Sequence, residues 1–171
     1  METKEANKKI PVIQGLAQDD GDEFFMEEAL NEARRAYSLN EIPIGCVITR
    51  QGQIIAKAAN LRTTNGNALH HAEILAIDQA CKATSDWRLE DCRLYVTIEP
   101  CPMCAGAIIQ ARIPVVVYGA KNPKAGCAGS ILNILEEPGF NHQAQVIAGV
   151  RENECANLMR EFFQNFRKQQ K

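Results

Sequence analysis

Pro100-Cys101-Pro102-Met103-Cys104 is the most informative stretch of this chain. Two cysteines three residues apart share one face of a helix's first turn, so both thiols can face one point. The free backbone N–H groups of that turn favour negative charge and lower a thiol pKa toward the thiolate that a metal requires. Proline is tolerated at such a helix start. The stretch therefore predicts a helix that begins at a metal site, although C-x-x-C alone also occurs in redox sites and in structural zinc sites.

The second part of the pattern is His71-Ala72-Glu73, about thirty residues upstream and just before another helical stretch. One histidine and two cysteines give zinc three ligands and leave its fourth position open, which is typical of a catalytic site. Two thiolates and a neutral imidazole cancel the charge of the ion, so the zinc-bound water needs a base to become hydroxide. We expect His71, Cys101 and Cys104 to bind one zinc ion and Glu73 to act as the proton shuttle.

Each part of this pattern has a simpler explanation when taken alone. A lone His71 is most often a core or surface histidine, and the Cys101/Cys104 pair could be buried or redox-active. A structural zinc site would need a fourth ligand, and His70 is the nearest candidate. Adjacent helical residues point about 100° apart, which makes His70 and His71 unsuited to one metal. The compound pattern H-x-E…P-C-x-x-C therefore favours a catalytic zinc site, and it resembles the signature of the zinc deaminases.

Composition describes an ordinary globular chain of 171 residues, 46% hydrophobic and 23% charged. The net charge of −2 excludes a strong overall basic field, so any contact with nucleic acid must rest on a local patch. No apolar run approaches the roughly 18 residues that a membrane span needs. The N-terminus carries no apolar signal segment, and the seven scattered cysteines do not resemble a disulfide framework. We expect a cytoplasmic protein that has no membrane contact.

Hydrophobic periodicity and turn residues predict one α/β domain over residues 22–171, preceded by a poorly ordered extension over residues 1–21. The fold class is a three-layer α-β-α sandwich, with a single mixed sheet of about five strands and helices on both faces. A strand, helix and strand within about 27 residues imply a parallel crossover. The expected helices are 23–40 with Asp22 as N-cap, a helix from residue 72, 101–111, a short turn over 131–135, and 152–168; the expected strands are 42–49, 54–58, 93–98, 115–119 and 145–150.

The motifs also carry a resemblance to a known family. The chain resembles the bacterial tRNA-specific adenosine deaminases, within the cytidine-deaminase-like zinc deaminases, from about residue 22 to residue 168. The segments that match are Glu41-Ile42-Pro43-Ile44-Gly45, Asn60, His71-Ala72-Glu73-Ile74, Leu94-Tyr95-Val96-Thr97-Ile98-Glu99-Pro100-Cys101, Ala105-Gly106-Ala107, Ala111-Arg112-Ile113, Tyr118-Gly119-Ala120, Gly129-Ser130, Asn141-His142 and Glu161-Phe162-Phe163.

This resemblance implies a zinc-dependent hydrolase that deaminates the wobble adenosine of tRNA anticodons to inosine. It implies a homodimer that binds the tRNA anticodon stem-loop across both subunits. Asn60 would hydrogen-bond the flipped adenine nucleotide, and Asn122 would face the neighbouring ribose. The family more often has an acidic residue at the position of Asn122, which puts the sugar contact of this chain in question.

Further substrate contacts are expected from charge and exposure. Lys124 in the irregular loop 121–130 and Arg167 near the end of the last helix are placed to meet phosphates. Phe162 and Phe163 are consecutive, so at least one leaves the core; packing and a substrate contact are equally supported for Phe163. Glu99, just before Pro100, is expected to support the helix start rather than to act as a catalytic acid. A guanine or cytosine deaminase is the alternative function, followed by a non-catalytic zinc-bearing RNA-binding subunit, against which Glu73 argues.

Overall fold

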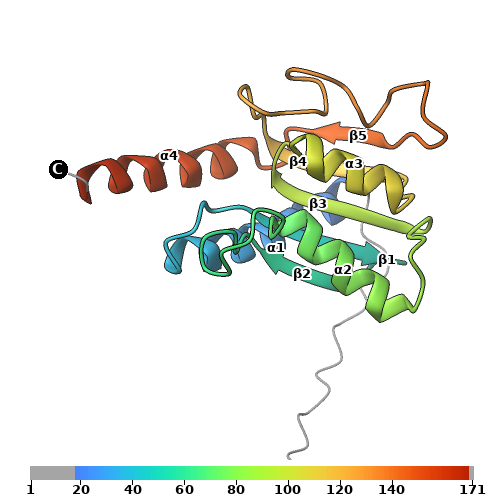
Figure 1. The fold of residues 1–171 in the computed structure, drawn as a ribbon, viewed down its shortest axis with the longest axis horizontal. Coiled ribbons are helices and arrows are strands. Elements are labelled where there is room, and N and C mark those ends of the chain that lie inside the picture. The colour runs from blue at the N-terminus through green and yellow to red at the C-terminus, as the bar shows by residue number, and fades with distance from the viewer. Residues whose placement is uncertain (1–17, 170–171) are drawn as a thin grey trace, which may run out of the picture.

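The computed structural model describes residues 18–169, which form four helices and one five-stranded sheet (Figure 1). The sheet order is β2-β1-β3-β4-β5, with antiparallel pairing among β2, β1 and β3 and parallel pairing among β3, β4 and β5. The elements are α1 Gln18–Ser38, β1 Gly45–Arg50, β2 Gln53–Ala59, α2 Ala72–Thr84, β3 Cys92–Ile98, α3 Pro102–Gln110, β4 Val115–Ala120, β5 Gln145–Ala148 and α4 Glu152–Gln169.

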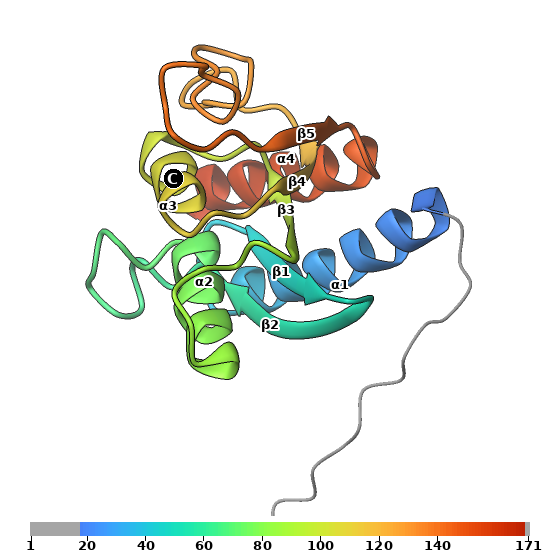
Figure 2. The same ribbon diagram turned by 90° about the vertical axis from the view of Figure 1, so that its right-hand side faces the viewer.

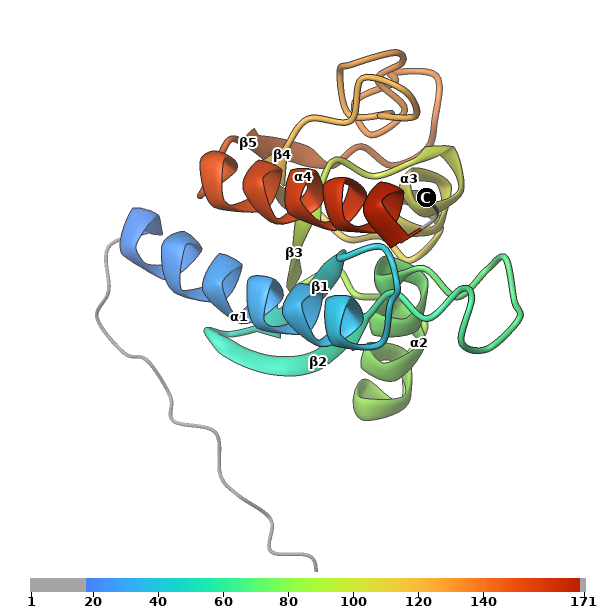
Figure 3. The same cartoon turned by 90° about the vertical axis from the view of Figure 1, so that its left-hand side faces the viewer.

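The helices form two layers around the sheet. Helices α2 and α3 cover one face, and α1 and α4 lie side by side on the other (Figures 2 and 3). A hydrophobic core lies on each face of the sheet. Alternate residues of β3 belong to one core or the other, because successive side chains of a strand point to opposite faces. Leu94 and Val96 join the core under α2 and α3, and Tyr95 joins the core under α1 and α4. The predicted three-layer sandwich with one mixed sheet is therefore confirmed.

Strand direction decides where the functional loops meet. Strands β2 and β3 both run antiparallel to β1, and β4 runs parallel to β3. The carboxyl ends of β2, β3 and β4 therefore lie at the same edge of the sheet. The segment 60–71 leads from β2 into α2 at this edge, Glu99 to Cys101 lead from β3 into α3, and the loop 121–130 leaves β4 there. The topology thus brings three segments that are distant in sequence to one place.

The start of α1 differs from the prediction. The helix begins at Gln18 rather than at residue 23, so Asp22 lies inside it and is not its N-cap. The buried Asp22 carboxylate accepts hydrogen bonds from the Tyr95 hydroxyl at 2.8 Å and from the Arg93 guanidinium at 3.0 Å. These partners from β3 hold an aspartate within a helix that local sequence predicted to begin later. The expectation for residues 1–17 lies outside the described residues, and the domain boundary at residue 22 stays a prediction.

The connection between β4 and β5 corrects a second expectation. The predicted helical turn over residues 131–135 is wrong, because this segment is irregular and carries one isolated bridge between Ala128 and Asn133. The bridge is antiparallel, so the chain turns back between residues 128 and 133 and returns along the end of the 121–130 loop. Within residues 18–169, no helix is both long and apolar enough to cross a membrane.

Candidate metal centre and active site

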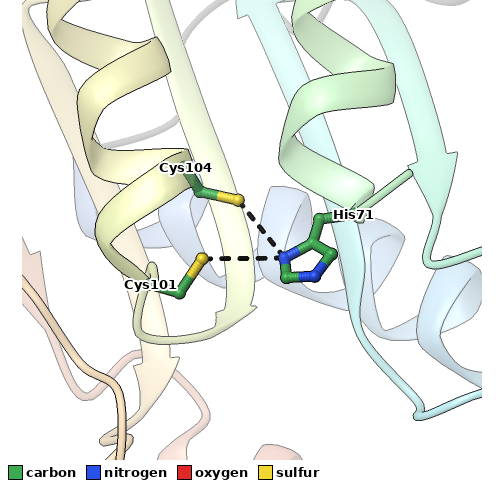
Figure 4. A group of neighbouring side chains, drawn as sticks. All are labelled: His71, Cys101 and Cys104. Carbon is green, nitrogen blue, oxygen red and sulfur yellow. Dashed lines mark hydrogen bonds between the residues drawn. The ribbon is translucent and has the colours of Figure 1, made fainter. Parts of the chain in front are cut away.

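Two adjacent helix starts bring together the three predicted metal ligands. His71 is the N-cap residue of α2, Cys101 is the N-cap residue of α3, and Cys104 lies in the first turn of α3. The His71 Nδ1 atom lies 3.6 Å from the Sγ atom of Cys101 and 3.6 Å from that of Cys104 (Figure 4). All three ligand atoms lie within 4.8 Å of one another. The helical spacing of the two cysteines and the shared sheet edge produce this arrangement.

The separations fit a tetrahedral zinc ion. Zinc–sulfur bonds near 2.3 Å and zinc–nitrogen bonds near 2.0–2.1 Å, at a tetrahedral angle, place nitrogen and sulfur about 3.6 Å apart. The two observed nitrogen–sulfur separations are both 3.6 Å. A set of one imidazole and two thiols is also the donor chemistry that zinc prefers over hard cations such as magnesium. The residues present therefore fit the ion and would leave its fourth position open.

The pKa values of the two thiols show that the site already stabilises one negative charge. The hydrogen bond from Cys104 lowers the pKa of Cys101 to about 4, against the opposing effect of burial, and His71 lowers it further. The pKa of Cys104 is raised, first because its proton is held against the Cys101 sulfur and then because the thiol is buried. Without a cation, the pair is thus a thiolate and a thiol. A divalent cation would favour loss of the second proton.

Glu73 stands beside this cluster in the first turn of α2. Its side chain is buried, and among the described residues its Oε2 atom has no hydrogen-bond partner. Desolvation is the main cause that raises its pKa to about 7, with a further contribution from the Cys101 charge. A buried carboxylate oxygen without a partner is costly unless something completes its hydrogen bonding. A water molecule at the open position of a zinc ion would do so.

Comparison with known proteins agrees with this site. A family model described as MafB19-like deaminase matches residues 20–167. The tRNA-specific adenosine deaminase of Bacillus subtilis is 52% identical over 150 residues, which cover 88% of this chain and 93% of that protein. The chain belongs to the tRNA-specific adenosine deaminase family. The Streptococcus pyogenes (serotype M18) member is 48% identical over 86% of this chain and 93% of its own length.

Two solved structures of deaminases have folds similar to that of this chain. A structure from a study of A-to-I editing by tRNA:A34 deaminases at the wobble position superposes with a TM-score of 0.76. It is 42% identical and covers 79% of this chain and 98% of its own. The guanine deaminase of Bacillus subtilis is also 42% identical, with a TM-score of 0.57, over 63% of this chain and 69% of its own.

Asn60 lies at the shared sheet edge of the deaminase, immediately after β2. It is buried, and its Nδ2 atom donates to the Ile42 carbonyl at 3.2 Å and to the Glu41 carboxylate at 3.4 Å. Glu41 also accepts a hydrogen bond from the backbone N–H of Thr64. The carboxylate therefore ties Asn60 to the loop that leads toward His71. Sequence analysis assigned no role to Glu41, although a glutamate next to the apolar run Ile42-Pro43-Ile44 was a signal of a buried, paired acid.

Glu99 has partners other than those expected. Its carboxylate accepts hydrogen bonds from the backbone N–H groups of Ala128 at 3.0 Å, Ser130 at 3.0 Å and Asn122 at 2.9 Å, and from the Ser130 hydroxyl. All of these groups belong to the loop after β4. Among the described contacts, none joins the carboxylate to α3, so its support goes to the 121–130 loop rather than to the helix start.

The remaining predicted substrate residues lie on two elements. The Oδ1 atom of Asn122 accepts hydrogen bonds from the backbone N–H groups of Lys124 at 3.3 Å and Ala125 at 3.2 Å, which closes a turn within the loop. Lys124 is exposed on this loop. Phe163 and Arg167 are exposed on the outer half of α4, which extends beyond the sheet (Figure 1). The structure thus leaves all four side chains near the surface, with Asn122 and Lys124 at the sheet edge that holds the metal ligands.

Proposed function

We propose that this chain deaminates adenosine to inosine at the wobble position of tRNA anticodons, with one zinc ion per chain. The observation that carries this proposal is the three-ligand cluster beside the unpartnered Glu73 oxygen. This arrangement has the parts that hydrolytic deamination needs, namely a metal site with an open position and a buried acid/base. The 52% identity to a relative named for tRNA adenosine supports the substrate.

The chemistry replaces the exocyclic amine of adenine by oxygen. A zinc ion held by His71, Cys101 and Cys104 would supply the Lewis acidity that lowers the pKa of a water molecule at its open position. Glu73 would accept a proton from that water through Oε2, and the water oxygen would form a bond to C6 of the base. Glu73 would pass this proton to the ring N1. It would then take the second proton, from the new C6 hydroxyl, and deliver it to the amine, so that the C6–N bond breaks, ammonia leaves and a C6 carbonyl remains. In the metal-free chain, burial raises the pKa of Glu73 to about 7, and the charge of a bound zinc ion would lower it, so the carboxylate would be ionised and able to accept the first proton at neutral pH.

Substrate positioning is assigned to residues around this centre. Asn60 would hydrogen-bond the flipped nucleotide, and Asn122 the adjacent ribose. Exposed Lys124 and Arg167 would meet phosphates, and Phe163 offers an aromatic face on which a base can stack. The homodimer and the cytoplasmic location, where tRNA is found, remain predictions; light scattering of the zinc-loaded protein tests the dimer.

A hairpin assay tests the proposal against the alternative. The protein is incubated with an anticodon hairpin that carries adenosine at the wobble position, and with a control hairpin in which this adenosine is moved by one nucleotide. We expect inosine only in the first hairpin. The likeness to a guanine deaminase motivates a parallel measurement of ammonia released from guanine and cytidine. Ammonia from a free base together with an unchanged hairpin would replace the tRNA function by the alternative.

A further inference from the structure

The Glu99 carboxylate is the most heavily hydrogen-bonded acid near the metal centre. It is 2% exposed and follows the last residue of β3. Three backbone N–H groups and one hydroxyl donate to it, and they come from both ends of the 121–130 loop, at Asn122 and at Ala128 and Ser130. A single side chain therefore fixes where the whole loop begins and ends.

The loop is built to close tightly around this carboxylate. A Cβ atom added at Gly126 would overlap the Glu99 carboxylate and lie 2.6 Å from the Asn122 carbonyl oxygen. Only glycine lets the backbone approach so closely. The Gly126 N–H donates to that same carbonyl at 2.7 Å, which keeps the loop in this course. The absence of a side chain at position 126 is thus as necessary to the contact as the acid at position 99.

A second contact joins the loop to the residue that precedes the first metal ligand. Cys127 donates its backbone N–H to the Pro100 carbonyl at 2.8 Å, and Cys101 follows directly as a ligand. The loop is therefore tied to two consecutive residues that precede the first thiol. Four donors converge on Glu99, and an ionised carboxylate has only acceptors. In Glu99→Gln, the side-chain NH₂ group would face N–H donors, so some of the four hydrogen bonds to this side chain would be lost.

We propose that Glu99 is a positioning residue for the deamination reaction. It holds the 121–130 loop in fixed register with Cys101, so that Asn122 and Lys124 meet the RNA backbone while the target base reaches the metal centre. The inference rests on the proposed function, because the loop's task is to contact substrate. Among the described contacts, none joins the Glu99 carboxylate to a metal ligand. Loss of the contact releases the loop and weakens substrate binding, whereas zinc binding and the chemical step persist.

Two variants test this through different atoms. Glu99→Gln removes the charge, and Gly126→Ala displaces the loop without altering a charged group. Gly139→Ala is the matched control, because its added methyl meets only the flexible end of Glu137. With the anticodon hairpin, we expect KM to rise about tenfold or more in both variants, since hydrogen bonds to a charged group are lost. The kcat should stay within about threefold, since the lost contacts bind ground state and transition state alike. Zinc should stay at one ion per chain, and Gly139→Ala should match wild type.

Hydrogen exchange supplies a readout that does not need activity. The amides of Asn122, Ala128 and Ser130 should exchange faster in Glu99→Gln than in wild type, and Ser130→Ala should give a smaller increase of the same kind. Unchanged amide exchange or an unchanged KM in Glu99→Gln overturns the proposal. Loss of zinc from this variant also overturns it, because Glu99 would then support the start of α3, which carries Cys101 and Cys104. A wild-type protein that makes no inosine refutes the proposed function separately, because the exchange result stands without it.

Discussion

Replacing Glu73 by glutamine should stabilise the metal-free protein. In the zinc-loaded protein, the same replacement should nearly abolish inosine formation. Burial raises the pKa of Glu73 from 4.5 to about 7 in the folded chain, so the folded state holds this proton more tightly than the unfolded state. Below pH 4.5 both states are protonated and Glu73 has no effect on stability. As pH rises toward 7, the unfolded chain ionises first and stability falls. Above pH 7 the full penalty is present, about 3 kcal/mol at 1.36 kcal/mol per pKa unit.

Glutamine fills the same space without a charge, so Glu73→Gln should be free of this penalty. The free energy of unfolding of the variant should exceed that of wild type by about 3 kcal/mol at pH 8, and by under about 1 kcal/mol at pH 5. Inosine formation by the zinc-loaded variant should fall by a factor of about 10² or more, because no group then moves protons between water, ring and amine.

The assay compares urea unfolding of both proteins after chelation of the metal, at pH 5 and pH 8, with turnover on the anticodon hairpin after zinc is restored. Zinc content of the reloaded variant serves as the control and should equal that of wild type. Equal stability of the two proteins at both pH values would refute the argument from burial. Near-normal turnover in Glu73→Gln would mean that another group is the proton shuttle.

Four further predictions concern the metal ligands and the loop beside them. Elemental analysis should find one zinc ion per chain in wild type and none in the Cys101→Ala/Cys104→Ala double variant; equal zinc in both would remove the ligand assignment. In the metal-free protein at pH 6, iodoacetamide should modify Cys101, whose pKa is about 4, and should spare the buried Cys155, whose pKa is about 12. Added zinc should protect Cys101 from this modification. Faster labelling of Cys155 than of Cys101 would contradict the thiolate assigned to Cys101. Lys124→Ala should make the slope of log affinity for tRNA against log salt shallower by roughly one unit. Asn122→Asp should raise the ratio of kcat/KM on the RNA hairpin to kcat/KM on its all-deoxy version. An unchanged slope and an unchanged ratio would place the RNA backbone elsewhere.

The metal centre was predictable because its signal is local. The spacing of Cys101 and Cys104 and the helix-start chemistry around them fix the direction of both thiols, and His71 stands at the start of the next helix toward the N-terminus. The order of layers was predictable for a similar reason, since apolar periodicity along each element gives its buried face. These are properties of short segments. Only the meeting of His71 with the two thiols is a long-range contact, and the compound pattern H-x-E…P-C-x-x-C indicated it.

What could not be predicted depends on partners that are distant in sequence. Asp22 lies within α1, where Arg93 and Tyr95 of β3 meet its carboxylate, whereas the sequence predicted it to cap a helix that begins at residue 23. Glu99 was assigned to the helix that follows it, yet its hydrogen bonds go to residues 122–130. Glu41 had no assigned role for the same reason. Buried acids acquire their functions from whichever backbone folds over them, and a single sequence does not show which one that is.

The most direct test of the central claim is to incubate the zinc-loaded protein with total tRNA and to read inosine at every position by sequencing. The account predicts that inosine forms at the wobble position of anticodons that carry adenosine there, and that none forms with Glu73→Gln. Total tRNA without new inosine, in a reaction where the same preparation releases ammonia from guanine or cytidine, would contradict it.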